Sequence, residues 1–281
     1  MVDIIAAILM AIFQGIIEWL PISSEGQLSL LFVNFYGMGE LEAITLALLL
    51  HIGTMISVVL VFWSDFREML DLNAKITKLI VITTLGTAIT AVPILLVFKN
   101  TWKTWTKIFP IPTDILFTVI VGILLILTGL TLASQPEQGT RELGSITQGE
   151  ALVLGMTQGI AALPGISRSG VTITLLLFFG LTQREALRIS FIISVPAVLG
   201  ASALEFLLSG FSIQSDALVV GTILFPYVLL VFTILLTVII GIITMKRLLS
   251  LEHLPYDKFC IGFGSGTILL AVILFIIQVV I

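Results

Sequence analysis

Long uncharged apolar runs alternate with short polar segments along this chain. Five runs hold at least 19 residues without Asp, Glu, Lys or Arg, and these are 43–63, 79–98, 115–133, 217–245 and 259–281. A sixth run, 187–208, is apolar apart from Arg188 and Glu205 near its ends. Because a helix rises about 1.5 Å per residue, each run can cross a hydrocarbon core of about 30 Å. The pattern therefore predicts six transmembrane helices.

Four shorter apolar runs of 10 to 14 residues accompany the long ones, at 4–17, 27–36, 151–163 and 171–181. Runs of this length are too short to span a bilayer, and here they indicate re-entrant half-helices. They form two pairs, and a polar turn rich in Gly, Pro and Ser separates the two members of each pair. The sequence thus predicts two hairpins of half-helices in addition to the six spans.

The two hairpins are copies of one another. The stretch AAILMAIFQGIIEWLPISSEG, residues 6–26, aligns without a gap on EALVLGMTQGIAALPGISRSG, residues 150–170, at a shift of 144. We infer two repeats, about 1–135 and about 145–281, within a single integral membrane domain covering 1–281. Each repeat has one hairpin and three full spans, and three is odd, so the second repeat must enter from the opposite side. This is the inverted repeat that builds a site at the membrane midplane from broken helices.

The composition supports an all-α polytopic membrane protein. The chain has 281 residues, of which 58% are hydrophobic and 11% are charged, whereas soluble domains carry about 25% charged residues. A net charge of −4, spread over scattered loops, provides no basic face for nucleic acid. The single cysteine, Cys260, excludes a disulfide framework and a zinc cluster.

The distribution of Lys and Arg predicts the orientation. Loops on the side of the N-terminus contain Lys99, Lys103 and Lys107. Loops on the other side contain Arg67, Lys75, Lys78, Arg141, Arg184, Arg188, Lys246, Arg247 and Lys258. By the positive-inside rule both termini face outward. Arg168 belongs to neither set, because it lies in the second re-entrant turn at membrane depth.

The two polar turns, 18–27 and 164–170, are expected to meet near the middle of the bilayer. A half-helix follows each turn, and the free N–H groups and positive dipole end of such a helix favour an anion. Hydroxyls in both turns and the planar guanidinium of Arg168 suit phosphate oxygens. Glu18 beside an anion fits a metal ligand or a proton acceptor. The predicted site therefore takes a phosphorylated ligand, with apolar spans around it for a lipid tail.

The segments EWLPISSEG and LPGISRSG, in a chain of ten hydrophobic segments, resemble the undecaprenyl-pyrophosphate phosphatase family, also called the bacitracin-resistance family. The resemblance covers essentially the whole chain. It implies hydrolysis of a polyprenyl diphosphate to the monophosphate, in the cell membrane, with a divalent cation (Mg or Ca) and an active site open to the outer face. The expected partners are the lipid substrate and the bilayer, and a homodimer is a further candidate.

The resemblance also assigns site residues. A family glutamate falls on Glu18 and the serine pair on Ser23 and Ser24, while the arginine falls on Arg168. The flanking positions of the second turn are Ser167, Ser169 and Gly170, and a pocket threonine corresponds to Thr172. We expect Glu18, Ser24 and Arg168 to be catalytic and the remaining residues to bind substrate. Ser24 or an activated water attacks phosphorus, and the sequence does not choose between them.

Four positions depart from the bacterial pattern. Gln14 stands where the family usually has a glutamate, and Gln27 stands where it usually has a histidine; both amides are expected to bind phosphate. Glu25, usually a small residue, is a candidate base and, with Glu18, a candidate metal ligand. His51, usually glutamine, is a second candidate base. Such a turn resembles archaeal members, whose lipid carrier is of the dolichol type.

Each of these residues also has a structural interpretation. Ser23 and Ser167 can serve as helix N-caps, and Glu25 as an acidic residue favoured in the first turn of a helix. His51 can be a hydrogen-bonded histidine within a span. An alternative function is a carrier that moves polyprenyl phosphate across the membrane through the same cavity, without hydrolysis.

Overall fold

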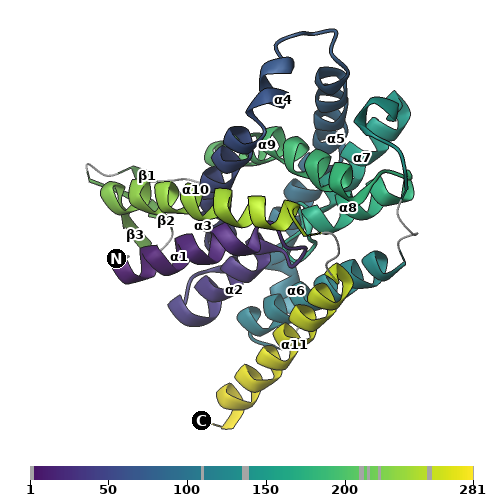
Figure 1. The fold of residues 1–281 in the computed structure, drawn as a ribbon. Helices are drawn as coiled ribbons and strands as arrows, with labels where there is room; N and C mark the ends of the chain where they lie inside the picture. The colour runs from purple at the N-terminus through teal and green to yellow at the C-terminus, as the bar shows by residue number, and fades with distance from the viewer. Residues whose placement is uncertain are drawn as a thin grey trace.

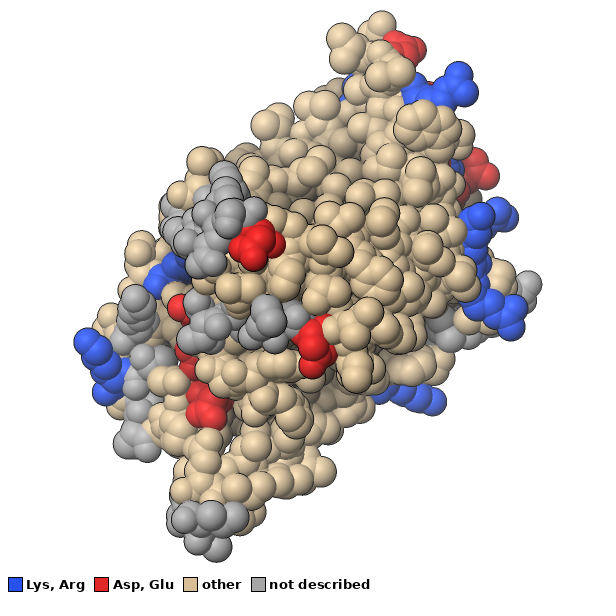
Figure 2. All heavy atoms as spheres, turned by 90° about the vertical axis from the view of Figure 1, so that its left-hand side faces the viewer, with Lys and Arg blue, Asp and Glu red and all other residues tan. Residues whose placement is uncertain are grey.

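The computed structural model describes residues 3–108, 111–134, 139–208, 212–213, 216–220, 223–251 and 255–280. Within these ranges six helices are long and apolar enough to cross a membrane, as predicted. They are α3 Glu40–Val61, α5 Lys75–Ile108, α6 Thr113–Ala133, α9 Gln183–Leu208, α10 Tyr227–Leu249 and α11 Tyr256–Val280. Figure 2 shows a face covered mainly by uncharged residues, with a few Asp and Glu within it and most of its Lys and Arg side chains along the margins. The chain is a multi-pass membrane protein.

The four short helices are also present. They are α1 Ile4–Ile17, α2 Ser24–Tyr36, α7 Gln148–Ile160 and α8 Arg168–Phe178, and α1 and α2 lie side by side in Figure 1. The starts of α7 and α8 follow those of α1 and α2 by the same 144 positions that relate the two sequence copies. A short helix, α4 Trp63–Glu68, and a 3-10 turn, η1 Leu143–Ser145, complete the helical elements of the described residues.

One predicted span begins too early. The run 217–245 was expected to be helical throughout, but its first part forms strands of a three-stranded antiparallel sheet. The strands are β1 Ser212–Ile213, β2 Ala217–Val220 and β3 Ile223–Pro226, with Leu218 paired to Phe225. Pro226 explains the boundary, because a proline disfavours helical geometry in the residue before it and suits the start of a helix. Hydropathy alone could not separate these strands from α10.

The first half-helix of each hairpin packs on a span of the other repeat. Helix α1 lies along α10, and α7 lies along α5, so the two contacts are reciprocal. Glycines allow the close approach: a Cβ at Gly15 would lie 2.8 Å from Cγ2 of Ile240, and one at Gly159 would lie 2.7 Å from the carbonyl oxygen of Thr87. The last spans of the two repeats, α6 and α11, occupy equivalent positions and pack on each other. The exchange fits two related repeats, while the opposite entry of the second repeat stays a prediction.

The two polar turns meet, as the sequence predicts. The backbone N–H of Gly165 donates to Oγ of Ser23 at 3.2 Å, and Oγ of Ser169 donates to the carbonyl oxygen of Leu20 at 3.4 Å. Residues 142 and 149 positions apart in the sequence are therefore joined directly. The start of α2 and the start of α8 consequently lie in one region of the molecule.

Candidate active site

The N-caps of the second half-helix of each hairpin fix the geometry of the turns. Oγ of Ser23 accepts from the N–H of Gly26, and Oγ of Ser167 accepts from the N–H of Gly170 at 3.2 Å. Ser23 has a φ of 59°, the left-handed region, which costs a residue with a side chain of order 1–3 kcal/mol. Its bond to Gly165 in the other turn helps to offset that cost. The capping interpretation of both serines is thus confirmed in geometry.

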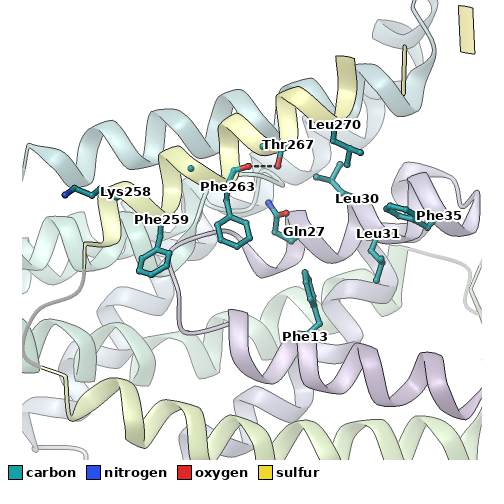
Figure 3. A pocket seen from close by; sticks show the side chains of 12 residues that line it. Phe13, Gln27, Leu30, Leu31, Phe35, Lys258, Phe259, Phe263, Thr267 and Leu270 are labelled. Carbon is teal, nitrogen blue, oxygen red and sulfur yellow. Dashed lines mark hydrogen bonds between the residues drawn. The ribbon is translucent and has the colours of Figure 1, made fainter. Parts of the chain in front are cut away.

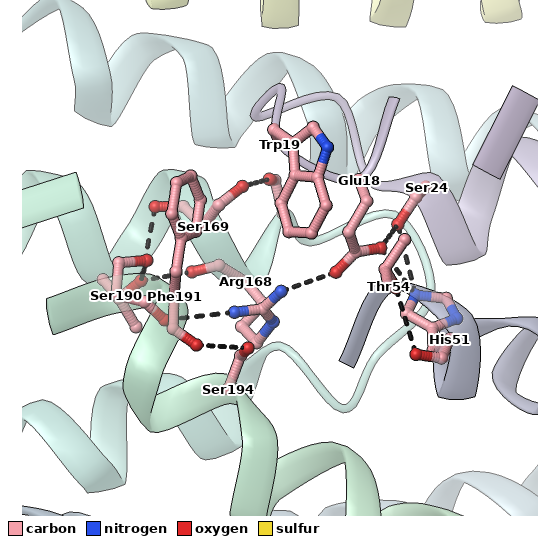
Figure 4. A network of polar contacts seen from close by, with 12 residues as sticks. Glu18, Trp19, Ser24, His51, Thr54, Arg168, Ser169, Ser190, Phe191 and Ser194 are labelled. Atoms are coloured by element: carbon pink, nitrogen blue, oxygen red, sulfur yellow. Dashed lines mark hydrogen bonds and ion pairs between the residues drawn. The ribbon is translucent and has the colours of Figure 1, made fainter. Parts of the chain in front are cut away.

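Glu18 and Arg168 form an ion pair between the two turns. Nη2 of Arg168 donates to Oε1 of Glu18 at 2.6 Å, and Glu18 is only 5% exposed. Figure 4 shows the two side chains pointing toward one another from different elements. Nη1 of Arg168 donates to the carbonyl oxygen of Ser190 on α9, which further fixes the plane of the guanidinium. The two charged residues that the resemblance assigns to catalysis are therefore in direct contact.

The second oxygen of Glu18 gathers three more polar groups. Oε2 accepts from Oγ of Ser24 at 2.6 Å and from Nε2 of Gln14 at 2.9 Å. Nε2 of His51 lies 3.1 Å from the same oxygen and 3.2 Å from Oγ of Ser24. The Ser24 hydroxyl is thus held between a carboxylate and an imidazole, an arrangement that can remove its proton.

The tautomer of His51 follows from its other ring nitrogen. Nδ1 lies 2.8 Å from the carbonyl oxygen of Ala47, one turn earlier on α3, and a carbonyl accepts only from a protonated nitrogen. Nε2 of the neutral ring is therefore an acceptor facing Ser24, and in the protonated ring it donates to Glu18. The backbone thus orients the imidazole for proton transfer at Nε2.

These groups line a cavity of about 460 Å³. The starts of α2 and α8 contribute the serines of the cavity together with Glu25 and Arg168. Much of the lining from α3, α5 and α9 is apolar. Apolar positions include Leu48, Ala88, Leu95 and Leu204. The cavity therefore combines a polar wall that suits phosphate with apolar walls that suit a hydrocarbon chain.

Most of the predicted site residues reach this cavity. Those lining it are Glu18, Ser23, Ser24, Glu25, His51, Ser167, Arg168 and Ser169. Gln14 stands behind the wall, where it bonds to Glu18, and Gly170 packs against Thr128 and Pro21. Oγ1 of Thr172 bonds to Oγ of Ser190 at 2.7 Å beneath the surface.

The prediction that Gln27 contributes to the phosphate site is not supported by its position. Gln27 lines a different cavity, between α2 and α11. A helix turns about 100° per residue, so Gln27 lies about 160° around α2 from Glu25. The two residues therefore face opposite sides of the helix.

One residue that lines the cavity, Glu205, was not among the predicted site residues. Glu205 is buried at the wall, where Nζ of Lys99 approaches its Oε2 at 2.5 Å and Oγ1 of Thr45 bonds to Oε1. This cluster ties α9, α5 and α3 together. The available sequence signal was the Glu205 carboxylate near the end of the apolar run 187–208.

Of the two candidate metal ligands, one offers a carboxylate that is available to bind the divalent cation implied by the resemblance. Arg168, Ser24, Gln14 and His51 already occupy both oxygens of Glu18. Glu25 lines the cavity, and within the described residues no hydrogen bond or ion pair holds its carboxylate. The described part of the chain brings together no group of three His, Cys, Asp or Glu. One carboxylate completed by phosphate oxygens is a usual set for Mg²⁺, so Glu25 fits and Glu18 is a poorer candidate.

Comparison with known sequences decides the family. The family described as Bacitracin resistance protein BacA matches residues 7–273. The chain belongs to the BacA family. Among curated relatives named Undecaprenyl-diphosphatase, that of Methanothrix thermoacetophila is 36% identical over 95% of this chain and 97% of its own. Those of Methanopyrus kandleri and Thermodesulfovibrio yellowstonii are 34% and 32% identical, over 95% and 92% of this chain and 96% and 92% of their own.

Proposed function

We propose that this BacA-family chain is an integral membrane phosphatase that hydrolyses a long-chain polyprenyl diphosphate, of undecaprenyl or dolichyl type, to the monophosphate and inorganic phosphate. The observation that carries the proposal is the Ser24 hydroxyl, held between Glu18 and His51 beside a cavity with extensive apolar walls. The name shared by the relatives supports the same chemistry. The reaction would recycle the lipid carrier of cell-envelope glycans.

Arg168 and the two helix N-termini hold the diphosphate in this mechanism. Arg168 uses two of its five N–H groups on Glu18 and Ser190, which leaves donors for phosphate oxygens. The first turns of α2 and α8 line the same cavity and contribute partial positive charge. Together they stabilise the charge that develops on the transferring phosphoryl group.

Two routes to phosphate release use the same groups. In the first, Oγ of Ser24 attacks the terminal phosphorus, its proton passes to Glu18 or His51, and the P–O bond to the polyprenyl monophosphate breaks. Water then hydrolyses the phosphoserine. In the second, water attacks directly and gives its proton to the same acceptors, while Ser24 orients it. Phosphoserine forms at Ser24 in the first route only. Mass spectrometry of protein quenched with acid during turnover would detect it.

A divalent cation fits this proposal at Glu25. The Glu25 carboxylate would hold the ion together with phosphate oxygens of the substrate. When bound, the ion neutralises phosphate charge. Glu18 stays engaged with Arg168 and keeps the serine oriented. Phosphate release measured with and without a chelator tests the requirement.

The charge distribution supports an outward orientation in the cell membrane. Basic residues concentrate in the loops opposite the N-terminus, so both termini and the mouth of the active site are proposed to face outside. A C-terminal tag on the full chain should therefore be labelled from outside intact cells. Protection of that tag, together with labelling of residues 246–258, would contradict the orientation.

The function is tested by phosphate release from a polyprenyl diphosphate in detergent, comparing Ser24→Ala with Ser29→Ala. Both serines are buried on α2, but the Ser29 hydroxyl has no hydrogen-bond partner within the described residues. Ser24→Ala should lower the rate by two or more orders of magnitude, whereas Ser29→Ala should leave it nearly unchanged. Tight lipid binding without phosphate release under Mg²⁺ or Ca²⁺ would favour the carrier instead.

A further inference from the structure

A second cavity, of about 570 Å³, lies on the opposite side of α2 from the candidate active site. Figure 3 shows it between α11 and the hairpin of α1 and α2, with side chains from all three helices pointing into it. Aromatic and aliphatic side chains dominate its lining, including Phe13, Leu30, Phe263 and Leu270. We call it the α11 groove. Its size is within the range of about 300–1,000 Å³ typical of small-molecule sites.

Two glycines keep the α11 groove open. Gly262 and Gly266 stand one turn apart on α11, both line the groove, and a Cβ added to either would meet nothing within 4 Å. Most other helical glycines of the described chain fill close contacts, as Gly15 does against Ile240. The space at Gly262 and Gly266 is therefore open, and a larger side chain can enter it without a clash.

The ends of the groove differ in chemistry. Lys258 stands at one end, exposed near the start of α11, and within the described residues no ion pair holds it. Leu270 stands at the other end, twelve residues further along α11, which is a rise of about 18 Å. Half of a hydrocarbon core of about 30 Å is about 15 Å, the depth of one leaflet. The groove therefore has a cationic side chain at one end and an apolar lining whose length matches the thickness of one leaflet.

Gln27 provides one polar point inside the groove. Nε2 of Gln27 is buried and lacks a hydrogen-bond partner in the described structure, a state that costs about 1–3 kcal/mol. Figure 3 shows Gln27 facing α11 beside Phe263. The Thr267 hydroxyl is not its acceptor, since Oγ1 of Thr267 donates to the carbonyl oxygen of Phe263 at 2.9 Å and makes no hydrogen bond with Nε2 of Gln27 in the described structure. An oxygen from the glycerol linkage of a membrane lipid would satisfy this donor.

We propose that the α11 groove binds one anionic membrane lipid, with its phosphate at Lys258 and one hydrocarbon chain along Phe259, Gly262, Gly266 and Leu270. An anionic headgroup is favoured over a zwitterionic one because no ion pair within the described residues holds Lys258, and one Lys near an anionic lipid surface contributes about fivefold in affinity. The lipid would come from the leaflet on the side of the α10–α11 loop. This site is separate from the cavity of Glu18 and Arg168 and does not rest on the proposed function.

The test measures apparent Kd for the first bound lipid by native mass spectrometry of the full chain in detergent. Dioleoyl phosphatidylglycerol is compared with dioleoyl phosphatidylcholine. Gly266→Leu fills the hollow, and Gly149→Leu is its control because Gly149 also has open space around its Cβ but lies outside the groove. Lys258→Gln removes the head contact, and Lys246→Gln removes an exposed cation outside the groove.

Gly266→Leu should weaken phosphatidylglycerol binding at least tenfold, and Gly149→Leu should leave it within twofold. Lys258→Gln should remove the preference for phosphatidylglycerol, about fivefold, while Lys246→Gln preserves it. Equal binding by all variants would overturn the proposal. A dimer that Gly266→Leu converts to monomer would assign the groove to a second copy of the chain. Weaker binding of polyprenyl diphosphate alone would assign it to the substrate tail, and both results would overturn the proposal.

Discussion

The ion pair between Glu18 and Arg168 gives the sharpest test of the site. Glu18→Gln is nearly isosteric but leaves the guanidinium of Arg168, whose side chain is 16% exposed, without its counter-charge. Removing one partner of a buried pair costs about 3–5 kcal/mol, and the partial exposure of Arg168 places the expected loss near 3 kcal/mol. Arg168→Gln is expected to cost about 2 kcal/mol, because Ser24 and Gln14 still donate to Glu18.

The double variant, Glu18→Gln with Arg168→Gln, carries neither charge and should be about 2 kcal/mol less stable than the wild type. The coupling free energy is therefore about 3 kcal/mol, measured by equilibrium unfolding in detergent with all four proteins. Phosphate release should fall at least 100-fold in both single variants and stay low in the double variant. The double variant would then be more stable than additive losses predict, yet it would remain inactive.

The exposed pair of Arg141 and Glu150 is the control cycle. Nη1 of Arg141 lies 2.7 Å from Oε1 of Glu150, but both side chains are partly in water, so its coupling should stay below about 1 kcal/mol. Additive losses for Glu18 and Arg168 would show that the two charges do not depend on each other. Recovery of activity in the double variant would show that the pair is structural. Either result would refute the mechanism proposed for this wall of the cavity.

Three further predictions concern other parts of the molecule. Hydrogen bonds from Arg141 hold the pKa of Glu150 at about 2, below its ordinary value near 4.5. Ionised Glu150 therefore stabilises the fold fully above pH 4.5, and this contribution disappears as the pH falls toward 2. The Tm difference between wild type and Glu150→Gln should shrink over that window. His51→Gln should lower phosphate release at least tenfold and flatten the acidic limb of its pH profile, and an unchanged profile would exclude His51 as the base. Gly165→Ala should lower stability by about 1–3 kcal/mol in equilibrium unfolding, because φ is +103° and the new Cβ would lie 2.8 Å from Cα of Val121; a neutral effect would contradict the close packing of the turn.

The hydropathy pattern was sufficient for the helices because the bilayer imposes strict lengths. Charge-free runs separate spans from half-helices, and the predicted start of the first half-helix, residue 4, is the observed start of α1. The helix α2 begins at Ser24, three residues before the predicted run, because polar Ser24 and Glu25 occupy its first turn. Apolar runs mark the hydrophobic part of a helix and omit a polar cap. The strands β2 and β3 were lost for the converse reason, since buried strands and spans are equally apolar.

The sequence predicted most residues of the candidate site, but it did not predict which cavity each side chain faces. Repeated motifs indicated that the turns meet, and the bond between Ser23 and Gly165 agrees. The rotation of α2 that directs Glu25 to one cavity and Gln27 to another depends on packing against several other helices, and no local pattern encodes it. Glu205 was missed for the same reason, because Lys99 and Thr45 are distant in sequence and become partners only in the folded chain.

Two residues that depart from the expected bacterial pattern, Gln14 and His51, contact Glu18 directly in this geometry. A carboxylate at position 14 would bring like charge to Glu18, whereas the amide of Gln14 donates to it at 2.9 Å and helps Glu18 stay ionised. An imidazole at position 27, on the face of α2 turned to α11, would not point at Ser24 in this packing. His51 supplies the imidazole from α3 instead, fixed by the carbonyl of Ala47. The chain therefore brings a carboxylate, an imidazole and a guanidinium around one serine, with the imidazole supplied by α3.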